Sequence, residues 1–220
     1  MSIVRVQDLR QQVYDDLRHR ILRGDFASDT KFQEIALSEE LGVSRTPVRE
    51  ALAMLVRDGL LEQMRRGFKF PKRSPRDVVD IIEVRLRLEP YAMRRMTERL
   101  DQAKRTELAE KVRTEIAAHP DGPGYIDAHV RIRQALMAHV ANRVLVEAIQ
   151  QFEDFSHVMR FATLSDPYWR EKSVTGNLRM VAAIEAGDAD EAEAAQVTLL
   201  EWARDSFLSH LASTSEDHND

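Results

Sequence analysis

Residues 41–52 read LGVSRTPVREAL, and this stretch decides the fold of the N-terminal part of the chain. Gly42 predicts a tight turn, Ser44 an N-cap, and Pro47 is tolerated in the first turn of the helix that follows. The apolar face of that helix carries Val48, Ala51, Leu52 and Leu55. Arg45 and Arg49 lie four residues apart, so their guanidinium groups project from neighbouring points near the helix N-terminus. Because a planar guanidinium can bond guanine O6 and N7 together, the stretch predicts a helix that reads the major groove of DNA.

The segments on either side of this helix predict a winged helix-turn-helix domain. The expected elements are helices over residues 8–23, 33–41 and 44–58, a loop over 25–32, and a hairpin with strands at 60–64 and 68–70. Gly24 ends the first helix, and Gly67 lies in the turn between the two strands. Three helices followed by a hairpin form this fold, so residues 1–72 are expected to bind DNA and residues 73–75 to form a linker.

The rest of the chain is predicted to be an all-α helical bundle of about six helices. They are expected over residues 76–99, 102–118, 124–140, 143–161, 167–186 and 189–211. Pro90 lies inside the first of them and predicts a kink. The bundle domain is expected over residues 76–212, and the polar residues 213–220 are expected to form a disordered tail. The fold class is therefore mostly α, with an N-terminal winged helix-turn-helix followed by this bundle.

The distribution of charge divides the chain at about the same point. Residues 1–74 carry 14 Lys and Arg against 11 Asp and Glu, whereas residues 75–220 carry 18 against 26. Basic surface therefore gathers in the part predicted to bind DNA, and the acidic remainder repels phosphates. The 220 residues include no Cys, and no apolar run approaches the roughly 18 residues that span a bilayer. A cytoplasmic location is expected, since no signal peptide is visible.

The sequence does not predict an enzyme. A catalytic site needs a nucleophile, a metal or an acid–base pair in a pocket. With no Cys, and with only 8 Gly that form no cluster, the chain offers neither a thiolate nor a glycine-rich phosphate loop. His129 and Asp127 are two residues apart on a predicted helix, so they cannot face each other. A purely architectural DNA-binding protein is another alternative, but it would not need so large a helical domain.

Several of these stretches resemble the winged-helix domain of GntR-type bacterial transcription regulators. They are residues 13–14, 21–24, 41–52, 58–61 and 66–67. Residues 83–90, EVRLRLEP, and 183–188, AIEAGD, are similar to the all-helical, FCD-type ligand-sensing domain of the FadR subfamily. The resemblance implies a homodimer that binds a short palindromic operator and responds to a small metabolite, with repression relieved by the ligand as the usual behaviour.

The resemblance also implies which residues contact the double-stranded DNA operator. By motif they are Ser44, Arg45, Thr46 and Arg49 on the helix and Arg65, Arg66 and Gly67 in the hairpin turn. Arg45 and Arg49 would meet guanines, and Gly67 would meet the minor groove at the tip of the wing. Ser44 and Thr46 would meet phosphates or base edges.

The chain departs from the family pattern at two sites. Ile35 stands where the second helix usually has a phosphate-binding arginine, which affects only a backbone contact because phosphates position and bases specify. Many members also hold a metal between an Asp, a His four residues later and a His from each of the last two helices. Here those positions are His129, Arg133, Asn177 and Leu199, of which one is a potential ligand. Arginine stays protonated and cannot bind a cation, so no metal and no other cofactor is expected.

Helical spacing places polar residues on the buried faces of three predicted helices. Those predicted to bind the effector are Arg85, His129, Arg133 and Asn177. Unpaired buried charges cost several kcal/mol, so something must neutralise the two arginines. The predicted answer is a small anionic metabolite, with its carboxylate or phosphate held by the arginine forks and hydrogen-bonded by the other two side chains.

Two alternatives stay open on the sequence alone. The arginines could form internal salt bridges with a carboxylate such as Asp127, Glu89 or Glu185, which would leave no small-molecule site. The chain could instead respond to an acyl-CoA, as a metal-free, fatty-acid-responsive branch of the subfamily does.

Overall fold

The structure of the chain is a computed structural model that divides into an N-terminal unit and a C-terminal unit. It describes residues 9–22, 25–26, 30–71, 74–120, 122–153, 155–156, 160 and 163–216. Residues 9–71 belong to the N-terminal unit, and residues 74–153 and 163–216 to the C-terminal unit. The fold is mostly α, with a helix-turn-helix unit followed by a helical bundle, as predicted.

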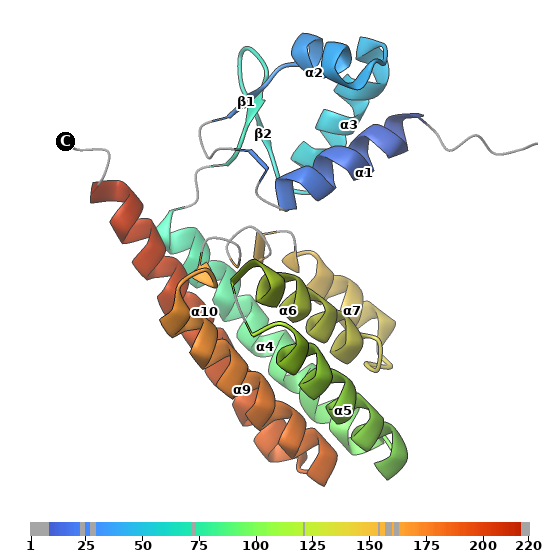
Figure 1. Cartoon of the computed structure of the whole chain (residues 1–220), viewed down its shortest axis with the longest axis vertical. Helices are drawn as coiled ribbons and strands as arrows, with labels where there is room; N and C mark the ends of the chain where they lie inside the picture. Colours follow the sequence, from blue (N-terminus) through green and yellow to red (C-terminus); the bar gives the residue numbers. More distant parts are fainter. Residues whose placement is uncertain are drawn as a thin grey trace, which may run out of the picture. The chain divides into compact units, whose positions relative to one another are not determined.

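The N-terminal unit packs three helices against a small sheet (Figure 1). Its elements are α1 (Leu9–Leu22), β1 (Lys31–Phe32), α2 (Glu34–Leu41), α3 (Arg45–Arg57), β2 (Glu62–Gln63) and β3 (Phe68–Lys69). The buried side chains follow the predicted helical spacing: Leu17 of α1 and Leu52 of α3 are completely buried in one apolar core. Gly42 ends α2 in the left-handed conformation, and Ser44 begins α3. The end of α2 and the start of α3 therefore lie where the sequence predicted them.

The sheet has three strands rather than the two that were predicted. β2 and β3 form the expected antiparallel hairpin, and β1 pairs with β3 on its other side, with Phe32 opposite Phe68. The prediction of a loop over 25–32 was therefore wrong for residues 31–32. A strand of two residues is too short to show an alternating pattern. Burial of its aromatic ring holds it in place, since Phe32 packs edge-to-face against Phe26 and Phe70 at centroid distances of 4.9 and 5.3 Å.

The C-terminal unit is a bundle in which the long last helix lies beside α4 and α9 (Figure 1). Its labelled helices are α4 (Pro75–Arg99), α5 (Gln102–Ala118), α6 (Gly122–Met137), α7 (Arg143–Gln150), α9 (Pro167–Ala186) and α10 (Ala189–Glu216). Ser74 caps α4: its hydroxyl accepts from the Asp77 amide at 3.2 Å, and the Asp77 carboxylate accepts from the Ser74 amide at 2.7 Å. α4 continues through the buried Pro90.

Three predicted helix boundaries in the bundle were wrong. The helix expected over 143–161 ends at Gln150, where the Phe152 amide bonds the Ile149 carbonyl in a tighter turn. The sequence has no Gly or Pro there from which this end could be predicted. The helix expected over 124–140 spans 122–137 instead. α10 runs to Glu216, so residues 213–216 are helical where a disordered tail was predicted; the Ser213 hydroxyl bonds the His210 carbonyl within the helix. Residues 217–220 lie outside the described residues.

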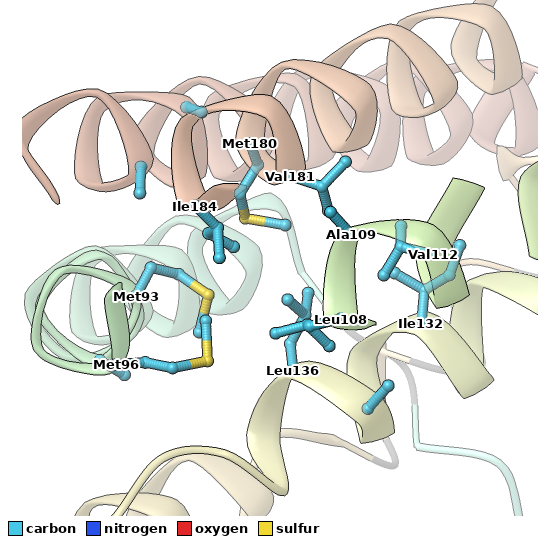
Figure 2. Packing of buried hydrophobic residues seen from close by; sticks show 14 of the residues in the cluster. Met93, Met96, Leu108, Ala109, Val112, Ile132, Leu136, Met180, Val181 and Ile184 are labelled. Atoms are coloured by element: carbon cyan, nitrogen blue, oxygen red, sulfur yellow. The ribbon is translucent and has the colours of Figure 1, made fainter. Parts of the chain in front are cut away.

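The apolar interior of the bundle receives side chains from α4, α5, α6, α7, α9 and α10. Figure 2 labels part of it: Met93 and Met96 from α4, Leu108, Ala109 and Val112 from α5, Ile132 and Leu136 from α6, and Met180, Val181 and Ile184 from α9. α9 and α10 approach closely at Gly176, where an added Cβ would lie 2.4 Å from a methyl of Leu199. The bundle is therefore closely packed around a core that is separate from that of the N-terminal unit.

The turn between α9 and α10 depends on Gly187. This residue has φ +78°, and the Asp188 amide bonds the Ala183 carbonyl across it at 2.9 Å. A Cβ at Gly187 would lie 1.7 Å from Nη1 of Arg105 in α5. Gly187→Ala should therefore lower the free energy of unfolding by about 1–3 kcal/mol through backbone strain and displacement of the guanidinium. Urea denaturation measures the effect.

A matched control for this prediction is Gly124→Ala. Gly124 is helical, and a Cβ there would meet nothing closer than 3.5 Å. This variant should leave stability unchanged or raise it by about 0.5–1 kcal/mol, since glycine is unfavourable within a helix. Equal urea midpoints for both variants would show that Gly187 is not under the constraint described.

Candidate functional site

The α3 helix has a fully buried face and a basic exposed face. Val48, Leu52 and Leu55 are completely buried, whereas Arg45 and Arg49 are exposed. The Arg45 side chain is 64% exposed and pairs loosely with Glu34, its Nη2 lying 3.4 Å from a carboxylate oxygen. Among the described residues, Arg49 has no ion pair or hydrogen bond from its side chain. Both guanidinium groups are thus available to a ligand on the exposed side of a helix that the core fixes in place.

The N-terminus of α3 leaves further donors exposed. Ser44 and Thr46 are exposed, and the Ser44 hydroxyl makes no capping bond to a helix amide. The first-turn amides and these hydroxyl groups can therefore donate to phosphate oxygens. Ile35 lies on α2 and is 54% exposed, so the position at which the family resemblance implies an arginine faces solvent but offers no charge.

The turn of the hairpin exposes Arg65 and Arg66 and requires Gly67. Gly67 has φ +87°, and its carbonyl accepts from the Met64 amide at 2.9 Å to close the turn. A Cβ at Gly67 would lie 2.5 Å from the backbone oxygen of Phe32 in β1. The glycine is therefore needed so that the turn can pass close to the third strand, and the two arginines project from a fixed wing.

A cluster of buried charges lies in the C-terminal unit, with Glu89 at its centre. Glu89 of α4 is completely buried. It accepts from Arg85 Nε at 2.6 Å and from both terminal nitrogens of Arg133 at 2.9 Å. Gln196 of α10 donates to the same carboxylate at 2.8 Å. The two arginine forks predicted to hold a ligand thus share a carboxylate of the chain itself, which is one of the internal partners that the sequence had suggested.

The other two carboxylates suggested as internal partners do not join the cluster. Asp127 is exposed, and Glu185 pairs with Arg113 of α5 at 2.6 Å. Instead, Glu153 completes the network. It accepts from Arg133 Nε and, at 2.6 Å, from Nη2 of the buried Arg160. We call Arg85, Glu89, Arg133, Glu153 and Arg160 the charge cluster.

The remaining predicted site residues lie beside the charge cluster. His129 precedes Arg133 by one helical turn on α6 and packs edge-to-face on Tyr125. The amide nitrogen of Asn177 donates to the Ser173 carbonyl at 2.8 Å, and the Ser173 hydroxyl accepts from Tyr125 at 2.9 Å. Arg85, Arg133 and Asn177 are buried as predicted, and His129 is half-buried. The structure brings the two arginines into direct contact with one carboxylate and holds Asn177 in a neighbouring hydrogen-bonded pair.

Considering only residues that the structure describes, two atoms in this region are buried without a hydrogen-bond partner. They are Nδ1 of His129 and Nη1 of Arg160. Burial lowers the pKa of His129 well below its ordinary value of 6.5, and the charges of Arg160 and Arg133 lower it further. His129 is therefore neutral at physiological pH, and adds no charge to the cluster.

The residues at the family's metal positions do not suit a cation. Arg133 is ion-paired with two carboxylates, Asn177 is held by Ser173, and the Leu199 side chain packs on Gly176. Within the described ranges, no three His, Cys, Asp or Glu side chains are placed to hold a metal ion. The expectation that this chain needs no metal stays a prediction, now with a physical reason at three of the four positions; His129 alone could donate to a cation.

Sequence reasoning missed Glu153, Arg160 and Gln196. Arg160 had one signal, because it interrupts the apolar run Val158-Met159-Arg160-Phe161. Gln196 had a weaker one, its helical spacing from the apolar Ala192 and Leu200, and Glu153 had none, since a Glu is usually solvated. Their importance depends on which helices meet, and that is visible only in the fold.

The charge cluster should make stability sensitive to acid. Burial alone would raise the pKa of Glu89, but the charges of Arg133 and Arg85 outweigh it and lower the pKa from 4.5 to about 2. A lowered carboxyl pKa contributes stability that is present above the unfolded value and lost as the pH falls toward the folded one. Between pH 5 and pH 2, about 3 kcal/mol of stability should therefore disappear. Urea midpoints across this range measure the loss.

The control for the acid prediction is a surface carboxylate. Glu191 also has a lowered pKa, through its hydrogen bond to Arg179, but it lies at the surface. Glu89→Gln should flatten the pH dependence of the urea midpoint, and Glu191→Gln should leave it nearly unchanged. A pH profile that is equally steep in both variants would assign the acid sensitivity to other groups.

Comparison with known protein families matches residues 80–201 to the FCD domain and residues 9–69 to the GntR family of bacterial regulatory proteins. The HTH-type transcriptional regulator YdhC of Bacillus subtilis, itself uncharacterized, is 26% identical over 83% of each chain. The gluconate operon transcriptional repressor of the same organism is 35% identical over 37% of this chain and 33% of its own.

Solved structures show the same fold. Escherichia coli McbR/YncC superposes with a TM-score of 0.73 at 24% identity, covering 96% of this chain and 99% of its own. A GntR regulator from Rhodococcus superposes with a TM-score of 0.74 at 21% identity, covering 91% and 97%. Among the described residues, no helix is both long and apolar enough to cross a membrane. The chain therefore belongs to the GntR family of bacterial regulatory proteins, in the group that joins a GntR DNA-binding domain to an FCD domain, and its relatives are transcription regulators rather than enzymes.

Proposed function

We propose that this protein binds a short palindromic DNA operator as a homodimer, and that a small anion bound in the C-terminal unit changes its affinity for the operator. The observation that carries the DNA part is the α3 helix, whose arginines are exposed on one face while the opposite face is completely buried. Such a helix can enter the major groove without disturbing the core behind it. Because named relatives include repressors, repression that the anion relieves is the proposed sign.

The contacts proposed for the operator follow from exposure and chemistry. Arg45 and Arg49 would bond guanine edges, and Ser44 and Thr46 would donate to phosphates or base edges. Arg65, Arg66 and Gly67 would approach the minor groove from the wing. The six side chains in this set are all exposed, which a contact with DNA requires, and Gly67 would make its contact through the backbone.

Exposed apolar side chains support a homodimer. Val84 and Tyr91 lie seven residues apart on one face of α4, where they are 44% and 49% exposed. Val144 of α7 is 68% exposed. Two copies that bury these side chains against each other would carry two α3 helices, which matches the two half-sites of a palindrome.

The charge cluster supports an anionic effector over a ligand-free core. A core stabilised only by internal salt bridges would be expected to pair every buried polar atom, yet Nη1 of Arg160 and Nδ1 of His129 have no partner in the described ranges. An organic acid or phosphorylated compound could supply the missing acceptor. One observation supports the alternative, a closed core without a small-molecule site: Glu89 already accepts hydrogen bonds from both Arg85 and Arg133. An acyl-CoA effector has no comparable support from these contacts.

The experiment has two steps with separate outcomes. Selection from a pool of random duplexes should enrich a palindrome, and fluorescence anisotropy should then measure its affinity for the full-length protein. Organic acids added one at a time should change that affinity, one of them by roughly 5–150-fold, the usual range of coupling between two sites. Failure to enrich any sequence would refute operator binding. A palindrome whose affinity no acid alters would support the closed core instead.

A further inference from the structure

The charge cluster contains more positive than negative charge. Three guanidinium groups, those of Arg85, Arg133 and Arg160, face two carboxylates, those of Glu89 and Glu153. The three arginine side chains are at most 10% exposed and Glu89 is completely buried, so solvent screens little of the imbalance. His129 is neutral and does not change it. Among the residues that the structure describes, one positive charge is therefore left without a counterion in the interior of the bundle.

The surplus charge can be assigned to Arg160. Arg133 contacts both carboxylates, and Arg85 contacts Glu89 through two nitrogens at 2.6 and 3.4 Å. Within the described part of the chain, Arg160 bonds only one carboxylate oxygen, through Nη2, although its side chain is 7% exposed. Its Nη1 is buried and has no partner among these residues. Of the three guanidinium groups, it is thus the least satisfied.

His129 lies near enough to this part of the charge cluster for the charges of Arg160, Arg133 and Glu153 to act on its pKa. It lies on the same face of α6 as Arg133, four residues away, and Arg133 and Arg160 meet at Glu153. A neutral imidazole can carry its proton on Nδ1, and that atom is buried without a partner. An oxygen that accepts from both Nη1 and Nδ1 would satisfy both unpartnered atoms.

We infer that the effector is a monoanion whose carboxylate accepts hydrogen bonds from Arg160 Nη1 and His129 Nδ1. This inference rests on the proposed function and specifies the class of its ligand: a monocarboxylate rather than a dicarboxylate or a phosphate dianion. One negative charge balances the cluster. A second would be buried beside the carboxylates of Glu153 and Glu89 with no cation left to pair with it.

The test compares acids that differ by one carboxylate. Isothermal titration of the full-length protein at constant ionic strength should detect acetate and propionate, and should find malonate and succinate weaker by about tenfold or more, since their second charge lacks a partner. Stronger binding of the dicarboxylates would overturn the inference while leaving an anion-responsive regulator in place. No binding of any of the four acids would overturn the inference and would leave a phosphorylated compound as the remaining class of the proposed effector.

Charge-changing variants test which groups set this preference. Arg160→Met removes the surplus charge and should abolish propionate binding. Glu153→Gln leaves two surplus charges and should reverse the order, so that succinate binds more tightly than propionate. Arg131→Met is the matched control, because Arg131 lies on the same helix but pairs with Glu115 outside the cluster. It should bind propionate as the unaltered protein does. Propionate binding that survives Arg160→Met, or an unreversed order in Glu153→Gln, would refute the assignment.

A measurement on the unaltered protein covers the case in which these variants do not fold. Nitrogen NMR of histidine-labelled protein should show a neutral His129 ring, and propionate should shift the resonance of Nδ1 while succinate at equal concentration should not. An Nδ1 resonance that propionate leaves unmoved would place the anion elsewhere and overturn the inference.

Discussion

Replacing Glu89 by alanine should lower the free energy of unfolding of the C-terminal unit by about 3–5 kcal/mol. The carboxylate accepts five hydrogen bonds, from Arg85, Arg133 and Gln196, in a fully buried position. Its loss leaves the guanidinium of Arg85 without a counterion and adds a further uncompensated positive charge to a cluster that already has one. Removing one partner of a buried pair is far more costly than removing the pair, because the remaining charge stays out of water.

Chemical denaturation followed by circular dichroism measures this loss, and Glu98→Ala is the control. Glu98 lies on the same helix and pairs with Arg94 and Arg95 at the surface, so its removal should cost no more than about 1 kcal/mol. Comparable losses in the two variants would mean that Glu89 is effectively solvated. The N-terminal unit has its own core, so a separate N-terminal transition should keep its midpoint in both variants.

The helices and their buried faces could be predicted from the sequence because local spacing determines them. Leu52 and Leu55 were placed on the apolar face of α3 by their spacing alone, and both are completely buried. The N-caps are equally local: Ser44, Asp101 and Asp166 are each the residue immediately before a helix. Such features depend on neighbours within four residues, and a single sequence contains those neighbours.

The pairing inside the bundle could be predicted only in part. The sequence indicated that Arg85 and Arg133 point inward, and it named Glu89 among three possible partners. Glu89 and Arg133 are 44 residues apart, so their bidentate pairing depends on how α4 and α6 cross. The role of Arg160 depends on the end of α7, where the chain turns without a Gly or Pro. Long-range packing decides both, and a periodic pattern does not encode it.

Removing Arg45 and Arg49 together should weaken binding to the selected operator by about 2–6 kcal/mol, since each guanine contact is worth about 1–3 kcal/mol and separated contacts are roughly additive. The fold should be unaffected, because Arg45 has only a loose pair at 3.4 Å and both side chains are exposed. Arg57→Ala is the control: this arginine also lies on α3 and is 74% exposed, but at the opposite end of the helix.

Fluorescence anisotropy with the operator and with a scrambled duplex distinguishes contacts to bases from contacts to phosphates. Loss of base contacts should lower the affinity for the operator more than the affinity for the scrambled duplex, whereas loss of phosphate contacts should lower both affinities equally. Equal losses on the two duplexes would show that α3 positions the protein on DNA without reading its sequence.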